Sequence, residues 1–118
     1  MENYKLVLPE NLNHFGYLFG GDLLKWVDEY AWIAATLDYP GHSLVTVAMD
    51  KVEFRRSVRE GTILRFVVEK ARVGTTSVCY GVTVFRGHPE TPDEGPIFST
   101  HVTLVHVDKD GHKTPLPR

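Results

Sequence analysis

Apolar residues recur at helical spacing over residues 22–37, a segment that contains neither proline nor glycine. This spacing is typical of an amphipathic helix that packs one face against a core. The apolar stripe consists of Leu23, Val27, Tyr30, Ala34 and Leu37, and the polar face of Lys25, Glu29 and Thr36. We expect Asp22 to act as the N-cap and the Pro40-Gly41 pair to end the helix.

Elsewhere the apolar residues alternate with polar or small ones at the period of a strand. The clearest run covers residues 43–54, where Val45, Val47 and Met49 fall on one side. Further strands are expected at residues 4–8, 62–71, 76–86 and 97–107, each bounded by turn-forming residues. Residues 87–96 hold three prolines and three acids, so we expect a solvated hairpin loop there rather than a domain linker.

One helix among about five strands indicates an α+β fold. The helix is apolar over more than half its circumference, so we expect it to lie in the concave face of a curved antiparallel sheet. A sheet this small leaves long edges, which proteins usually pair or cover. A dimer that extends the sheet would cover one of them.

The composition is that of an ordinary globular protein and predicts one domain over residues 1–118, with 42 % hydrophobic and 24 % charged residues. A net charge of −2 argues against a nucleic-acid partner. The lone cysteine, Cys79, excludes an intrachain disulfide, and we expect a reduced thiol packed in a strand. The chain shows no signal-peptide pattern and no apolar run long enough for a membrane span, so we expect a cytoplasmic protein.

Asp28 is the candidate catalytic acid. A helical wheel places it on the shoulder of the apolar face, between Leu24 and Ala35 on one side and Trp32 on the other. Apolar neighbours partly desolvate a carboxylate, which raises its pKa toward the range useful for general-base catalysis. The alternative is a surface or intersubunit salt bridge.

The turn before the helix adds two further candidates. Gly20 and Gly21 have no side chains, and their backbone N–H groups lie at a helix start. There these N–H groups could stabilise an oxyanion. Asn13 supplies a neutral amide that could hold a water molecule or substrate. The plainer alternatives are a tight glycine loop and an asparagine that completes a turn before Gly16.

These motifs together resemble the hot-dog acyl-CoA thioesterases, in particular cytosolic acyl-CoA hydrolases and their bacterial relatives. The resemblance rests on Asn13-x-x-Gly16, on Phe19-Gly20-Gly21 and on the helix segment that carries Asp28. It continues through residues 45–54, 58–61 and 72–77 and ends near residues 115–117, leaving out the loop 87–96.

The resemblance implies a hot-dog fold that hydrolyses acyl-CoA to a free fatty acid and CoA. It implies that Asp28 is the catalytic carboxylate, as general base or as nucleophile, and that Asn13 assists it from the partner subunit of a dimer. It further implies assembly of three dimers into a hexamer.

CoA carries several phosphate charges, so local positive charge is expected. Arg55, Arg56 and Arg59 cluster after residue 54, and Arg72 precedes a turn. Arg55, Arg56 and Arg72 are therefore candidate CoA-binding residues. The resemblance implies that the turn formed by Gly74, Thr75, Thr76 and Ser77 contacts the pantetheine arm and the nucleotide. Strand alternation makes it unfavourable for Arg55 and Arg56 to face the ligand together, and a solvated strand edge is the alternative for each arginine.

Two other functions are compatible with parts of this sequence. A hot-dog dehydratase acting on hydroxyacyl thioesters would use a His–acid pair, which His14 and Asp28 could imitate, but here Gly16 rather than proline follows Phe15. An acyl-CoA-binding sensor without turnover would not need a full catalytic set. The six histidines lack metal-ligand spacing, His101 and His106 should face opposite sides of one strand, and no nucleotide-cofactor fingerprint is present, so we expect no metal and no cofactor.

Overall fold

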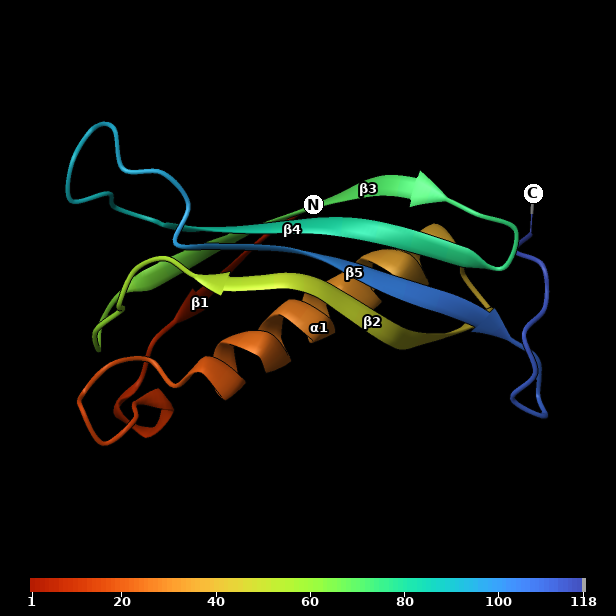
Figure 1. Cartoon of the computed structure of the whole chain (residues 1–118), viewed down its shortest axis with the longest axis horizontal. Coiled ribbons are helices and arrows are strands. Elements are labelled where there is room, and N and C mark those ends of the chain that lie inside the picture. Colours follow the sequence, from red (N-terminus) through yellow and green to blue (C-terminus); the bar gives the residue numbers. More distant parts are fainter. Residues whose placement is uncertain (118) are drawn as a thin grey trace.

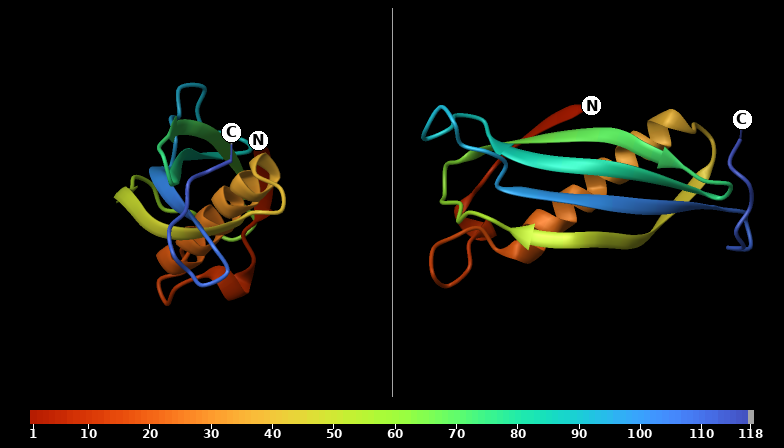
Figure 2. Two further views of the ribbon diagram at one scale, coloured as in Figure 1. Left: turned by 90° about the vertical axis from the view of Figure 1, so that its right-hand side faces the viewer. Right: turned by 45° about the horizontal axis from the view of Figure 1, so that its top comes forward.

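One long helix lies across one face of a five-stranded antiparallel sheet in the computed structural model, which describes residues 1–117 (Figure 1). In chain order the elements are β1 (Glu2–Leu6), the short 3-10 helix η1 (Pro9–Asn11), α1 (Gly20–Asp38), β2 (Ser43–Phe54), β3 (Ile63–Val73), β4 (Ser77–Arg86) and β5 (Phe98–Val107). The sheet order is β1-β3-β4-β5-β2, and the views in Figure 2 show the sheet curling over the helix. This confirms the α+β class and the predicted packing of the helix in the concave face.

All five strands lie within two residues of their expected positions, and β2 has the expected bounds. Residues 87–96 join β4 to its neighbour β5, as a hairpin requires. The expectation that this loop is solvated is wrong for one residue, because the Glu94 side chain is only 4 % exposed. The buried carboxylate of Glu94 pairs with Arg86 and Arg56.

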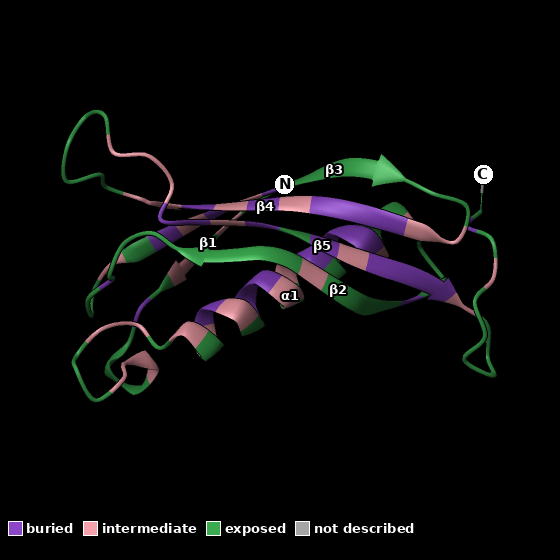
Figure 3. Ribbon diagram, viewed as in Figure 1, coloured by how far each residue is buried: buried purple, intermediate pink, exposed green. Residues whose placement is uncertain are grey.

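The core fills the space between α1 and the sheet (Figure 3). Phe66 on β3 is fully buried, with the Trp26 ring 6.5 Å and the Tyr30 ring 4.9 Å from it, both edge-on. Cys79 on β4 is buried as a free thiol, as expected. Among residues 1–117, no helix combines the length and the hydrophobicity needed to cross a lipid bilayer.

Two details of the helix differ from expectation at its start. Helix α1 begins at Gly20 with Phe19 as the N-cap, so Asp22 lies inside the first turn and is not the cap. Asp22 instead accepts a hydrogen bond from Asn11 Nδ2 at 3.1 Å, which ties the helix to η1. The positive end of the helix still favours an acid at this position.

The predicted apolar stripe is also wrong at its far end. Leu37 is 68 % exposed, whereas Trp26, Ala31 and Ala35, outside the stripe, are buried. The buried face therefore shifts around the helix along its length. A straight helix that crosses a twisted sheet contacts it through such a shifting face, which a fixed stripe does not describe.

Strand β2 forms one edge of the sheet, and no strand within residues 1–117 pairs with its outer side. Its ladder with β5 is irregular in two places, between Thr46 and Ala48 and between Asp50 and Glu53. Apolar side chains are nevertheless exposed along it, including Val45 at 44 % and Val47 at 55 %. A long edge with exposed valines is a surface suited to pairing with another chain.

The same substitution at two positions of α1 tests the shifted helix face. Leu23→Ala should lower the free energy of unfolding by about 2–5 kcal/mol, because Leu23 is 3 % exposed and its loss leaves a cavity. Leu37→Ala should change it by no more than about 0.5 kcal/mol, since that side chain is 68 % exposed. Urea unfolding followed by tryptophan fluorescence measures both, and equal losses would contradict the burial described here.

Candidate active site

Asp28 projects from α1 toward the edge strand β2. The hydroxyl of Thr46 on β2 donates a hydrogen bond to Asp28 Oδ1 at 2.6 Å. A hydrogen bond to a carboxylate is stronger than one between neutral groups. This bond therefore orients the Asp28 carboxylate and leaves its Oδ2 for another partner. Within residues 1–117 Asp28 forms no ion pair, so the salt-bridge alternative finds no support inside one chain.

Sequence reasoning did not single out Thr46. Alternation placed it in a strand, but nothing in that pattern linked it to a helix residue 18 positions earlier. The link comes from the sheet order, which puts β2 at the edge beside the helix. A polar side chain opposite the candidate acid becomes visible only once that order is known.

An apolar cavity of about 610 Å³, the Asp28 cavity, opens beside this carboxylate. Its walls come from α1 and the first half of β2: Asp28, Glu29, Trp32, Ile33, Leu44, Val45 and Thr46. The Trp32 indole N–H donates to the Leu44 carbonyl at 3.1 Å, which holds the ring against β2. The cavity thus combines a mainly apolar lining with a hydrogen-bonded acid.

Asn13 is already engaged through its oxygen. Asn13 Oδ1 accepts hydrogen bonds from the backbone N–H groups of Phe15 at 2.9 Å and Tyr17 at 3.2 Å. The turn-forming alternative is therefore correct for this atom. Since both partners are donors, the other end of the amide is the NH₂ group, and Asn13 can act on a ligand only as a hydrogen-bond donor.

A second cavity of about 270 Å³, the Asn13 cavity, lies at the start of the helix. Asn13, Gly20, Phe54, Arg56 and Ser57 are among the residues that line it. A Cβ at Gly20 would lie 3.0 Å from the exposed Phe54 ring, so a side chain at this position would require that ring to shift by a few tenths of an ångström.

The first turn of a helix leaves its leading N–H groups without intrahelical partners. The amides of Gly20 and Gly21 are in that turn. Only Gly20 lines the Asn13 cavity, whereas Gly21 is exposed, with its Cα side against the Phe19 ring. Of the two glycines predicted to form an oxyanion hole, only Gly20 therefore faces this cavity.

One chain does not bring Asn13 and Asp28 into one cavity. The residues that line the Asp28 cavity and those that line the Asn13 cavity do not overlap. His14, the other partner considered for Asp28, is exposed and lies against the Phe15 ring. Neither candidate pair is assembled within residues 1–117.

The candidate CoA-binding residues are divided among three places. Arg56 lines the Asn13 cavity, whereas Arg55 lines a small cavity with Lys51 and His101, which fits the alternation argument that the two arginines face different sides. Arg72 near the end of β3 and the Gly74–Ser77 turn that leads into β4 lie at the end of the sheet opposite the helix start (Figure 1). That turn is closed by a Gly74 N–H to Ser77 carbonyl hydrogen bond of 2.7 Å.

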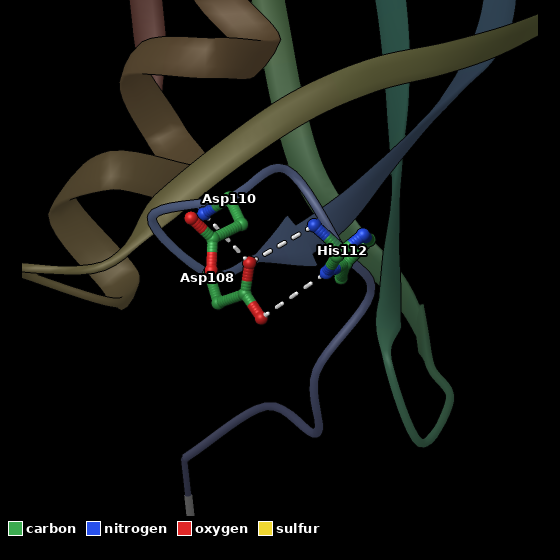
Figure 4. Close-up of side chains that lie close together, drawn as sticks. All are labelled: Asp108, Asp110 and His112. Carbon is green, nitrogen blue, oxygen red and sulfur yellow. Dashed lines mark hydrogen bonds and ion pairs between the residues drawn. The ribbon is translucent and has the colours of Figure 1, made fainter.

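Beside the β5 terminus, Asp108, Asp110 and His112 bring three metal-type ligand atoms within 4.8 Å of one another (Figure 4). All three residues are exposed. Asp108 Oδ1 accepts the backbone N–H groups of Asp110 and His112, at 2.9 and 3.0 Å, so the grouping follows from how this turn closes. His101 is exposed and His106 buried, as expected for opposite faces of β5.

The sequence of this chain matches a known protein family. Residues 15–92 match the family model described as the thioesterase superfamily. Protein VdlD of Helicobacter pylori is 31 % identical over 113 residues, which are 96 % of this chain and 64 % of that protein. The chain therefore spans less than two thirds of the length of that relative.

Two solved structures match almost the whole chain. The acyl-CoA hydrolase of Staphylococcus aureus, in complex with butyryl-CoA, CoA and CoA disulfide, is 27 % identical with a TM-score of 0.87, covering 99 % of this chain and 71 % of that one. A hexameric hotdog fold thioesterase of Campylobacter jejuni is 30 % identical with a TM-score of 0.83, covering 98 % and 88 %. The chain has the hot-dog fold and belongs to the thioesterase superfamily.

Proposed function

We propose that this protein hydrolyses acyl-CoA thioesters to a carboxylic acid and CoA, in a site shared between two copies of the chain. The observation that carries the proposal is the Asp28 carboxylate, which accepts a hydrogen bond from Thr46 at 2.6 Å and lines a mainly apolar cavity. An acyl chain fits the apolar wall, and the thioester carbonyl then lies beside the acid. The S. aureus relative was solved with butyryl-CoA and CoA bound.

In the general-base route, Asp28 takes a proton from a water molecule that attacks the thioester carbonyl carbon. The C–S bond then breaks, and the proton passes to the departing CoA sulfur. In the nucleophilic route, an Asp28 oxygen attacks the carbonyl carbon, the C–S bond breaks and CoA leaves as its thiolate, which takes up a proton. Water then hydrolyses the mixed anhydride that remains. In either route Thr46 is a positioning residue, because its hydroxyl occupies Oδ1 and directs Oδ2 to the substrate.

The negative charge that develops on the carbonyl oxygen needs hydrogen-bond donors. We propose that the Asn13 NH₂ group and the Gly20 amide supply them, since both line the Asn13 cavity. Gly21 adds its amide as a neighbour in the same first turn, where the helix dipole also favours an anion. Asn13 acts here as a donor to the oxygen rather than as a base.

Two-fold symmetry explains how separate cavities form one site. Thr46, which holds Asp28, is in the first half of β2, and Phe54, which lines the Asn13 cavity, ends the same strand. Antiparallel pairing of two β2 edges exchanges these ends. It therefore brings the Asn13 cavity of one copy toward the Asp28 cavity of the other and covers the exposed valines of β2.

The proposed assembly follows from the same pairing. The dimer is the catalytic unit, and three dimers form a hexamer. The C. jejuni relative is hexameric. Structures of the S. aureus enzyme include alanine variants of an asparagine, an aspartate and a threonine, the three residue types that meet in the site proposed here.

We further propose that Arg56 binds the CoA portion of the substrate next to Asn13. By the exchange of ends described above, Arg72 and the Gly74–Ser77 turn of one copy approach the Asn13 end of the other, where their donors can contact CoA. We assign Arg55 a smaller role in CoA binding, because it lines a different cavity. A reduced Cys79 thiol is consistent with a cytoplasmic location, which we propose for the enzyme.

Asp28→Asn should lower kcat by about 10²-fold or more, because the amide neither accepts the proton nor attacks the carbonyl. Release of CoA thiol from a panel of acyl-CoA chain lengths measures this. Asp110→Asn, the same change in an exposed turn, is the control. Equal cleavage by Asp28→Asn and native protein would make Asp28 structural, and no cleavage of any substrate by native protein would overturn the thioesterase proposal.

The two chemical routes differ in where oxygen from solvent ends up. During a single turnover in labelled water, label enters the Asp28 carboxylate only in the nucleophilic route, when water attacks the Asp28 carbonyl of the anhydride, and the general-base route leaves Asp28 unlabelled. Mass spectrometry of the peptide that contains Asp28 distinguishes them. We expect an unlabelled Asp28, and label in this residue would establish the nucleophilic route.

Co-expression of two inactive variants tests the shared site. Asn13→Ala and Asp28→Asn subunits, each inactive alone, should form mixed dimers in which one of the two sites has both residues intact. With random pairing, roughly a quarter of the native activity should return. Purification of mixed dimers through two different tags confirms their formation. If mixed dimers form and stay inactive, the site is contained within one subunit.

A further inference from the structure

The side chain of Glu94 is almost fully buried, whereas residues 88–93 of the same loop are exposed. Of the three acids in residues 87–96, Glu90 and Asp93 are exposed, while the Glu94 side chain is 4 % exposed. A carboxylate at this depth is stable only if cations or hydrogen bonds compensate its lost hydration. The residues that compensate it belong to two different parts of the chain.

Arg86, the last residue of β4, donates from Nε to Glu94 Oε1 at 2.7 Å, and its side chain is 10 % exposed. Arg56 approaches the same oxygen, with 4.0 Å between its Nε and Oε1. The Arg86 hydrogen bond, aided by the charges of both arginines, holds the pKa of Glu94 below its usual value. The carboxylate therefore stays ionised between two guanidinium groups at neutral pH.

This cluster connects the loop to the wall of the Asn13 cavity. Arg86 also donates from Nη2 to the Ser57 carbonyl at 3.1 Å, and Ser57 and Arg56 both line that cavity. At the other end of the loop, Ile97 accepts the Arg55 N–H at 3.0 Å and lines the same cavity. The segment after β2 is thus held in place by residues that flank or belong to the loop.

The charges of the cluster leave Arg56 able to bind an anion or carbonyl. Two arginines and one glutamate sum to one positive charge, and Arg86 is the closer partner of Glu94. The Arg56 side chain remains 47 % exposed. Its guanidinium can therefore present donors to a ligand while Glu94 restricts its orientation, which suits the planar geometry of arginine recognition.

We propose that Glu94, fixed by Arg86, is a positioning residue that holds Arg56 in the orientation in which it binds the oxygen acceptors of the CoA moiety. This inference rests on the proposed function. It adds a role for the loop 87–96, the segment left out of the resemblance on which the sequence-based site rested. The acceptors are either the phosphates or the pantetheine carbonyls, and the experiment separates them.

Glu94→Gln should raise KM for acyl-CoA about tenfold and leave kcat within about twofold. A tenfold rise in KM is at the lower end of the loss in binding affinity expected when a charge-assisted hydrogen bond to the ligand is weakened. Asp93→Asn, the same type of change on the adjacent exposed residue, should leave both constants unchanged. Thermal unfolding of each variant confirms that the proteins compared are folded.

A double-mutant cycle with Arg56→Gln separates positioning from a general effect on the fold. If Glu94 acts through Arg56, Glu94→Gln should add no further rise in KM when Arg56 is already glutamine. If Glu94→Gln raises KM or lowers kcat equally in the native protein and in the Arg56→Gln variant, the proposal is wrong. Should Glu94→Gln be unfolded, Glu94→Asp, which keeps the charge but shortens the side chain, is assayed in both backgrounds by the same criterion.

Comparison of acyl-CoA with the matching acyl-pantetheine thioester identifies the acceptor. Loss of the Glu94→Gln effect on acyl-pantetheine assigns Arg56 to the phosphates, and its retention assigns Arg56 to the pantetheine arm. Calorimetric titration with CoA itself keeps the two proposals distinguishable. If native protein binds CoA but cleaves no thioester, the proposed function fails, while weaker CoA binding by Glu94→Gln than by native protein still supports the positioning role.

Discussion

Burial of one face of α1 in the concave side of the sheet is the packing interaction on which the other features depend. Fully burying a large side chain such as Phe66 contributes roughly 1.5–3 kcal/mol, and the rings of Trp26 and Tyr30 pack on it from the helix. Because the sheet is twisted, the buried face shifts along the helix. Asp28 is thereby left at the margin of the contact, where β2 supplies Thr46 as its partner.

The position of β2 at the edge links this packing to the chemistry. The strand that orients Asp28 is also the strand with an unpaired outer side and exposed valines, so the acid lies next to the surface most suited to a second copy. Pairing there would extend the sheet, enclose the Asp28 cavity and bring in Asn13. In the proposed dimer, one contact would both cover the edge of the sheet and complete the site.

Much of the fold was predictable because local patterns and tertiary structure agree. Period-two alternation located β2 to the residue, and the proline- and acid-rich loop 87–96 was placed between neighbouring strands. The errors arose where a local rule met a tertiary constraint. Asp22 did not cap the helix because the helix starts two residues earlier, and Leu37 left the stripe because the contact face shifts.

The sequence by itself determined the α+β class, the candidate acid on the helix, and the asparagine and glycines before it. These are properties of residue type and periodicity, which act over a few positions. Only the tertiary structure decided that Thr46 holds Asp28, that the Asn13 oxygen is used by its own turn, and that Glu94 is buried between two arginines. Each of these depends on sheet order and loop closure, because hydrogen bonds and ion pairs join residues that are near in space but that no local pattern relates.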